Sequence, residues 1–152
     1  MRRAIELSRT AGIESKTGGC FGAVVVKDGE IIGEGSNHVL AKNDPTWHGE
    51  IEAIREASKN LQTPHLDGAI LYTSAEPCPM CLSASYWAHI KEIYYGATYD
   101  DVMNYGEFQD KSFRDELLKK PSDRKIPSFN IEREEAIEVW KEYQQMPDKR
   151  HY

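Results

Sequence analysis

This chain of 152 residues is poor in cysteine, in excess positive charge and in long apolar runs. It has only three cysteines, which does not suggest a disulfide framework, and we therefore expect a reducing, cytoplasmic setting. No apolar run approaches the roughly 18 residues of a membrane span. The basic start, residues 1–6, is not followed by the apolar stretch of an export signal. The sequence thus predicts no membrane partner.

The charge balance bears on possible partners. The formal net charge is −6, and the basic residues alternate with acids rather than forming clusters. Tight nucleic-acid binders usually need grouped lysine and arginine to meet phosphates, so a large RNA or DNA substrate is disfavoured. The apolar share of 39% and the charged share of 29% are ordinary for a folded domain. We expect a single domain over residues 1–152.

What the chain does contain is a pair of chemistry-bearing fragments, His48-Gly49-Glu50 and Pro77-Cys78-Pro79-Met80-Cys81. The imidazole of His48 and the thiols of Cys78 and Cys81 can supply three of the four ligands of a tetrahedral zinc ion. The fourth position then remains for a reactive water, and Glu50 is placed to carry its proton. H-x-E followed by P-C-x-x-C is the signature of zinc-dependent nucleobase deaminases.

The spacing within each fragment predicts the local structure. Two cysteines three apart at a helix start have both thiols on one side of the first turn, where the helix dipole favours thiolates. His48 and Glu50 are two apart, so both can reach one metal only if it lies beyond a helix tip. We therefore predict two helix N-termini converging on one zinc, at the ends of the first and third strands.

The hydrophobic pattern predicts alternating strands and helices. An Asp28-Gly29 turn joins the first two strands as a hairpin. The order predicts an α/β layered domain with a mixed sheet. The expected strands are 21–27, 30–35, 69–74, 92–97 and, fifth, 128–131; the expected helices are 1–12, one from about 48 to 61, 78–88, 111–119, and a last one carrying Ala136, Ile137, Trp140 and Tyr143 that Pro147 ends.

At these motifs the chain resembles the cytidine deaminase-like superfamily and, within it, bacterial guanine deaminases. The matching stretches are residues 21–29, Asn43-Asp44-Pro45-Thr46, residues 71–81 and Tyr86-Trp87-Ala88. The resemblance implies a three-layer α/β/α sandwich with a central mixed five-stranded sheet. It also implies that His48, Cys78 and Cys81 bind one Zn²⁺ and that Glu50 shuttles protons. The implied reaction converts guanine to xanthine and ammonia.

Further roles follow from the resemblance alone. Asn37 matches an asparagine that hydrogen-bonds the purine, and Asp110 matches a second carboxylate that assists departure of the amino group. Phe21 and Trp87 match aromatic side chains of the base pocket. Without the resemblance, a turn residue, a helix cap and two core aromatics would be the simpler interpretations.

The resemblance also indicates what lies around the site of the small-molecule base. Gly49 stands where relatives usually have alanine and would remove a methyl group beside the substrate. Relatives are homodimers whose C-terminal segment, here about 132–152, crosses to the neighbour and covers its pocket. Tyr152 would then be a lid residue contributed by the partner.

Several alternatives stay open. The substrate can be another amino-heterocycle: cytosine, a nucleoside, a triazine such as ammeline, or a tRNA adenosine. Cys78 and Cys81 can also form a redox pair, or, with Cys20 as fourth ligand, a closed structural site in a non-catalytic zinc-binding module. His38, His65, His89 and His151 are interpreted as surface or packing histidines.

Overall fold

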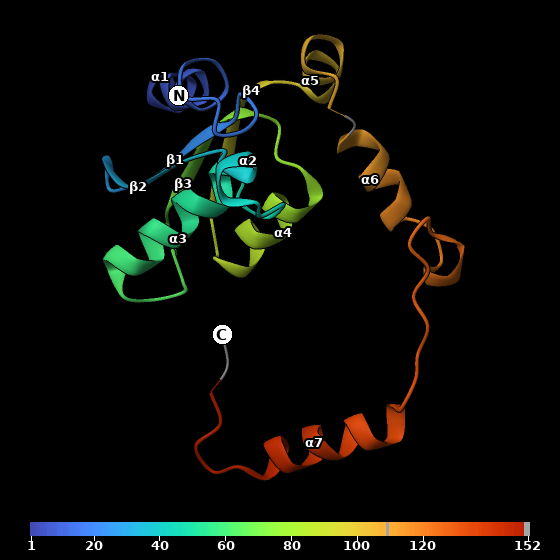
Figure 1. Cartoon of the computed structure of the whole chain (residues 1–152). Coiled ribbons are helices and arrows are strands. Elements are labelled where there is room, and N and C mark those ends of the chain that lie inside the picture. The colour runs from blue at the N-terminus through green and yellow to red at the C-terminus, as the bar shows by residue number, and fades with distance from the viewer. Residues whose placement is uncertain (109, 151–152) are drawn as a thin grey trace.

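The computed structural model describes residues 1–108 and 110–150. Its centre is a four-stranded mixed sheet in the order β2-β1-β3-β4 (Figure 1). β1 is antiparallel to both β2 and β3, and β3 is parallel to β4. The strands span Gly22–Lys27 (β1), Glu30–Ser36 (β2), Ile70–Ala75 (β3) and Glu92–Ala97 (β4).

Helices cover both faces of the sheet. α1 lies on one face, while α3 and α4 lie on the other (Figure 1). The predicted α/β layers with a mixed sheet are confirmed. The helices are Arg2–Arg9 (α1, continued by a π-helical turn Thr10–Glu14), Val39–Lys42 (α2), Gly49–Leu61 (α3), Pro79–Trp87 (α4), Tyr99–Gly106 (α5), Asp110–Leu117 (α6), a 3₁₀ turn Pro121–Asp123 and Arg133–Gln145 (α7).

The hairpin between β1 and β2 has the predicted turn. Asp28 and Gly29 both have positive φ, at 52° and 85°, as a type I′ turn requires. A bulge between Val25 and Val26 shifts the register of this pair. The turn therefore sets which side chains of β1 and β2 share a face.

Small residues let α3 pack closely on β2. A Cβ on Gly33 would lie 2.3 Å from the carbonyl oxygen of Ala53, and one on Gly35 would lie 2.1 Å from that of Gly49. Only glycine fits at such distances. The core under this contact is made of buried small and aliphatic side chains: Ala23, Val25, Ala53, Ala57, Leu66, Ala69, Leu71 and Ala88.

The predicted fifth strand is wrong. Residues 128–131 have no strand structure, and Phe129 and Ile131 are 74% and 79% exposed. The segment connects the 3₁₀ turn to α7, away from the sheet (Figure 1). An alternating apolar pattern forms a strand only beside a free sheet edge, and none lies next to this segment. α5 was not predicted; a capping box between Thr98 and Asp101 begins it.

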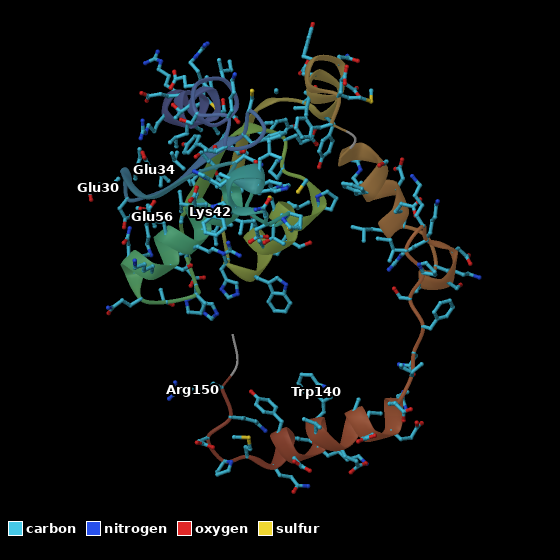
Figure 2. All side chains as sticks on the ribbon, in the orientation of Figure 1. Glu30, Glu34, Lys42, Glu56, Trp140 and Arg150 are labelled. Atoms are coloured by element: carbon cyan, nitrogen blue, oxygen red, sulfur yellow. The ribbon has the colours of Figure 1, made fainter. Side chains whose placement is uncertain are left out.

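The C-terminal part leaves the body of the molecule. From α6 onward the chain runs along one side, and α7 lies apart from the sheet and its helices (Figure 1). None of the residues of α7 is buried, and Trp140 projects from the side of α7 that faces the rest of the chain (Figure 2). Within the described ranges, no helix is both long and apolar enough to cross a membrane.

Candidate metal centre and active site

Two helix starts place the metal-ligating side chains. His48 is the N-cap of α3 and Cys78 the N-cap of α4, both with extended backbone, and Cys81 lies in the first turn of α4. Pro79 occupies the first helical position, where its missing N–H costs nothing. The predicted convergence of two helix N-termini is therefore confirmed. It lies where β3 ends and the antiparallel β1 begins, and Gly22 N donates to Ser74 Oγ there at 3.0 Å.

The spacing of these atoms fits a zinc ion. Nδ1 of His48 lies 3.5 Å from the sulfur of Cys78 and 3.5 Å from that of Cys81. A zinc ion with a nitrogen ligand at about 2.0–2.1 Å and a sulfur ligand at about 2.3 Å holds the two atoms about 3.5 Å apart at a tetrahedral angle. These three residues form one group able to hold a single metal ion. The donor set therefore suits one Zn²⁺.

The two thiols differ in acidity because they share a proton. A hydrogen bond from the Cys81 thiol, aided by His48, lowers the pKa of the Cys78 thiol to about 4. The same bond and burial raise the pKa of Cys81. The first thiolate is thus on Cys78, and a divalent cation that replaces the shared proton makes both cysteines ligands.

Glu50 is a buried carboxyl group beside the ligands. It follows His48 in the first turn of α3 and is only 4% exposed. Burial, as the largest cause, raises its pKa above the ordinary value for glutamate, and the nearby Cys78 raises it further. A carboxyl group with a raised pKa takes up a proton more readily than an exposed carboxylate does. This property suits a proton carrier.

A cavity opens onto this centre. Its volume is about 370 Å³, and His48, Glu50 and Cys78 are among the residues that line it. Phe21 lines it, as predicted from the resemblance, and meets Phe108 edge-on with ring centroids 5.0 Å apart. Phe108, Glu76 and Phe113 also line it, and none of the three was predicted to belong to the site. Phe108 lies two residues before Asp110, which is the only local signal that could have pointed to it.

Asn37 presents one end of its amide to this cavity. It is 4% exposed, and its Oδ1 accepts hydrogen bonds from Gly19 N and Val39 N, each at 3.2 Å. Because only an oxygen can accept from two N–H groups, the amide orientation is fixed. The NH₂ group is then the part of Asn37 that can bind a ligand, and it offers two donors.

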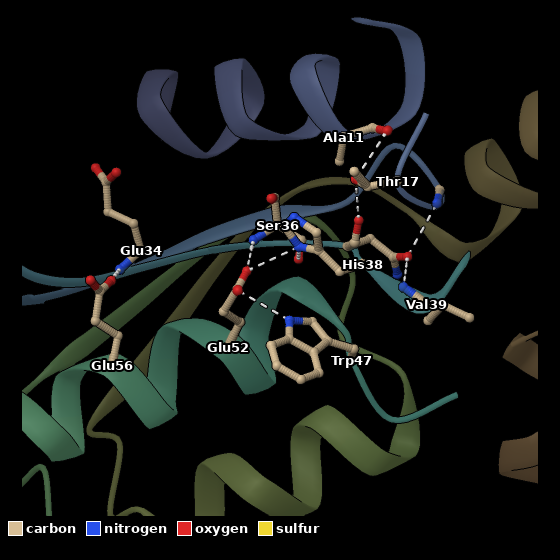
Figure 3. A network of polar contacts seen from close by, with 11 residues as sticks. Ala11, Thr17, Glu34, Ser36, His38, Val39, Trp47, Glu52 and Glu56 are labelled. Carbon is tan, nitrogen blue, oxygen red and sulfur yellow. Dashed lines mark hydrogen bonds and ion pairs between the residues drawn. The ribbon is translucent and has the colours of Figure 1, made fainter. Parts of the chain in front are cut away.

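A polar network holds the Asn37 loop against α3 (Figure 3). Glu52 accepts from Ser36 N at 2.8 Å and from Trp47 Nε1 at 3.0 Å, and His38 Nδ1 lies 3.4 Å away. Lys42 lies over the Trp47 ring at 5.4 Å. The residue before the metal ligand His48 and the strand before Asn37 are thereby fixed to the same helix.

Three predicted residues lie away from the cavity. Trp87 is at the far end of α4 and is 64% exposed. A Cβ on Gly49 would meet Gly22 Cα and Phe21 O at 3.2 Å, so the absent methyl faces backbone, and Gly49 is not among the residues that line the cavity; its predicted place beside the substrate stays a prediction. Cys20 is exposed and lies outside the His48 group, which argues against a closed site with four protein ligands.

Two predictions fall where the structure gives no side chain. Asp110 is the first residue of α6, and its side chain is outside the described residues. Tyr152 also lies outside the described residues. Both roles stay predictions.

Comparison with known proteins identifies the family. Residues 1–97 match the cytidine and deoxycytidylate deaminase zinc-binding region, which is more than half of the chain and includes every residue of the metal centre. The chain belongs to this deaminase family. It is 43% identical to guanine deaminase of Bacillus subtilis over 152 residues, covering 100% of this chain and 96% of that protein.

Solved structures of deaminases have the same fold as this chain. The crystal structure of guanine deaminase from Bacillus subtilis superimposes with a TM-score of 0.93 over 99% of this chain and 95% of that chain, at 43% identity. Guanine deaminase from Nitrosomonas europaea gives 0.65 over 72% of this chain and 62% of that one, at 33% identity. A tRNA-specific adenosine deaminase of Agrobacterium fabrum is 41% identical over 97 residues, 64% of this chain and 62% of that protein.

Proposed function

We propose that this member of the deaminase family catalyses the zinc-dependent hydrolysis of guanine to xanthine and ammonia. The observation that carries deamination is that His48, Cys78 and Cys81 form one metal-ligating group, and that His48 and Cys78 line one aromatic cavity together with the buried Glu50. The preference for guanine is supported by similarity to a guanine deaminase along the whole chain, including the residues beyond 97. The family signature alone would leave the substrate open.

The residues divide the work as follows. His48, Cys78 and Cys81 hold the zinc, which, when bound, brings the pKa of water near 7. Glu50 accepts one proton as water adds to the amino-bearing ring carbon and delivers it to a ring nitrogen. It then accepts the proton of the new hydroxyl group and delivers it to the departing amino group. The carbon–nitrogen bond breaks, ammonia leaves, and a carbonyl remains. Burial raises the pKa of Glu50, which makes its carboxylate a stronger proton acceptor than an exposed one.

The cavity provides binding and orientation. Phe21 and Phe108 offer apolar faces to a planar base, and the NH₂ group of Asn37 donates to an acceptor on the base edge. Asp110, as a second carboxylate, assists departure of the amino group. Because the cavity is apolar on most sides with few polar groups, it suits one small heterocycle.

We further propose that the 152-residue chain is a single deaminase domain that works as a homodimer in the cytoplasm, with segment 132–152 swapped onto the partner. Two observations support the swap. α7 lies apart from the body with Val139 and Trp140 64% and 70% exposed. A second, apolar cavity of about 590 Å³ lies beside His48, lined in part by Met80, Phe113 and Leu117. The partner's segment would cover it and bring Tyr152 to the site.

The second candidate substrate is an adenosine in tRNA, because the similarity to tRNA-specific adenosine deaminases is substantial. That similarity covers 64% of the chain, whereas the guanine deaminase match covers all of it. The net charge of −6 also opposes binding to a polyanion. Guanine is therefore preferred.

The test is ammonia release from guanine, adenine, cytosine, guanosine, ammeline and a tRNA stem-loop by the zinc-loaded enzyme. We expect turnover of guanine above all others. Rapid turnover of another amine with none of guanine would refute the substrate assignment.

Glu50→Gln tests the mechanism. The variant should keep one zinc per chain and lose about a thousandfold or more in kcat, because the amide cannot accept a proton. Glu56→Gln is the matched control, since Glu56 lies on the exposed face of the same helix and binds Glu34 N (Figure 3). Equal activity in the two variants would remove Glu50 from the mechanism.

A further inference from the structure

A second cluster of metal-ligating side chains lies at the opposite ends of β3 and α4. His65 and Asp67 precede β3, and His89 follows α4. One ligand atom from each lies within 4.8 Å of those of the other two. Nine residues of α4, about 14 Å of helix, separate this cluster from the zinc ligands at the start of that helix. It is therefore a separate site.

Backbone hydrogen bonds bring these side chains together in advance. Leu66 N donates to Ala88 O at 2.8 Å, and Lys91 N donates to Ala69 O at 2.8 Å. Leu66 itself is completely buried in the core. These hydrogen bonds hold the loop before β3 beside the loop after α4. An ion that binds there would therefore not have to order either loop.

The distances match a coordination site. Nδ1 of His89 lies 3.3 Å from Oδ1 of Asp67. Nitrogen and oxygen ligands at about 2.0–2.1 Å from a tetrahedral zinc ion are about 3.3–3.4 Å apart. The rings of His65 and His89 stack with centroids 4.3 Å apart, which places the His65 imidazole beside the pair formed by His89 and Asp67.

One nitrogen of the cluster needs a partner. Nε2 of His65 is shielded from solvent and has no hydrogen-bond partner among the described residues. Buried polar atoms are nearly always bonded, and each exception calls for an explanation such as an ion or a water. An ion in this cluster supplies one.

The backbone of His89 gives a second indication. Its φ is +56°, in the left-handed region just after the last turn of α4, where glycine is usually found. Histidine here accepts a less favourable conformation. Unlike glycine, histidine at this position has a side chain, and its imidazole lies beside Asp67.

We propose that His65, Asp67 and His89 bind a second divalent transition-metal ion, with Zn²⁺ as the probe. Two imidazoles and one carboxylate suit such ions better than Mg²⁺ or Ca²⁺. The side chains of His89 and Asp67 are 47% and 74% exposed, so water completes the coordination. The ion joins the start of β3 to the end of α4 and stabilises the folded state by binding linkage.

The experiment is calorimetric titration of the enzyme that already holds one zinc per chain. We expect a second equivalent of Zn²⁺ to bind and the melting temperature to rise with free Zn²⁺. His89→Asn and Asp67→Asn should each weaken that second binding by about tenfold or more, with the first zinc retained. Asparagine tolerates the positive φ at position 89, so this variant should fold.

His38→Asn is the control, because it removes an imidazole outside the cluster. It should bind the second ion like the unmodified chain. No second equivalent at roughly 1 mM free Zn²⁺ would overturn the proposal. So would undiminished binding in both cluster variants, since the ion would then be held elsewhere. Turnover of guanine plays no part in either readout, so failure here leaves the proposed function untouched.

Discussion

At the scale of single residues, Asn37 shows how a hydrogen-bond pattern limits what a site can recognise. Its oxygen is used by Gly19 N and Val39 N, so only its NH₂ group remains for a ligand. The cavity therefore favours a base with an acceptor on that edge. Asn37→Asp preserves both backbone bonds but replaces the donor with a second acceptor.

We expect Asn37→Asp to lower kcat/KM for guanine by about 100-fold, since a buried donor is lost and two acceptors then face each other. The zinc content and the melting temperature should stay close to those of the unmodified enzyme. Steady-state kinetics measure this effect, with Asn43→Asp, on the same connection but outside the cavity, as the control. Unchanged kinetics would show that Asn37 only shapes the loop.

Single residues were also the level at which the sequence was most and least informative. His48, Cys78, Cys81 and Glu50 could be grouped from spacing, because helix geometry fixes where such short motifs point. Phe108 could not, because it reaches Phe21 through tertiary packing across 87 positions. The sequence predicts His65 and His89 only as surface or packing histidines, and nothing in their 24-residue separation shows that they stack.

At the scale of elements, α3 carries His48 and Glu50, so the position of α3 on the sheet determines where these two side chains lie. The position of α3 depends on Gly35, where a Cβ would lie 2.1 Å from Gly49 O and 2.5 Å from Ala53 N. Both are backbone atoms, so the helix itself would have to move. Gly49 is less restricted, because its Cβ would meet neighbours at 3.2–3.3 Å.

We expect Gly35→Ala to destabilise the fold by about 1–3 kcal/mol, as overpacking does, and to lower the melting temperature by roughly 3–10 °C. Zinc content should fall as well, because the start of α3 shifts. Gly49→Ala should change both quantities much less. Thermal unfolding and metal analysis of the two variants provide the comparison; similar effects would mean that the close contact of α3 and β2 does not set the metal centre.

Element prediction worked where local pattern and packing agree. β4 has the predicted bounds, Glu92–Ala97, because its β-branched and aromatic residues Ile93, Tyr94 and Tyr95 favour a strand and β3 lies beside it as a pairing partner. The segment at 128–131 has a similar local pattern but no sheet edge beside it. A strand is completed by its neighbour, and sequence patterns contain no information about where that neighbour lies.

At the scale of the whole molecule, the chain taken alone leaves apolar surface uncovered. Val139 and Trp140 on α7 and Leu118 near α6 are 64%, 70% and 83% exposed. Isolated helices gain most of their stability by burying such a face. A second copy of the chain is the occupant that the proposed dimer provides.

Mixed dimers test whether the C-terminal segment acts on the partner's site. One chain would carry Glu50→Gln with its C-terminal segment intact, and the other would end at Ile131 with its metal centre intact. The Glu50→Gln chain alone lacks the proton carrier and the shortened chain alone lacks the covering segment, so each chain expressed alone should be nearly inactive. In the mixed dimer, the intact site of the shortened chain is covered by the segment of the Glu50→Gln chain, and we expect guanine turnover to return there.

Co-expression with two different affinity tags isolates the mixed dimer, and ammonia release measures its activity. Recovery to about half the activity per dimer of the unmodified enzyme is expected, because one of two sites is complete. A mixed dimer that forms but stays inactive would show that each segment serves its own chain. Failure of the two tags to co-purify would contradict the dimer itself, because the swapped segment, with Trp140 at its centre, is the contact proposed to hold the two chains together.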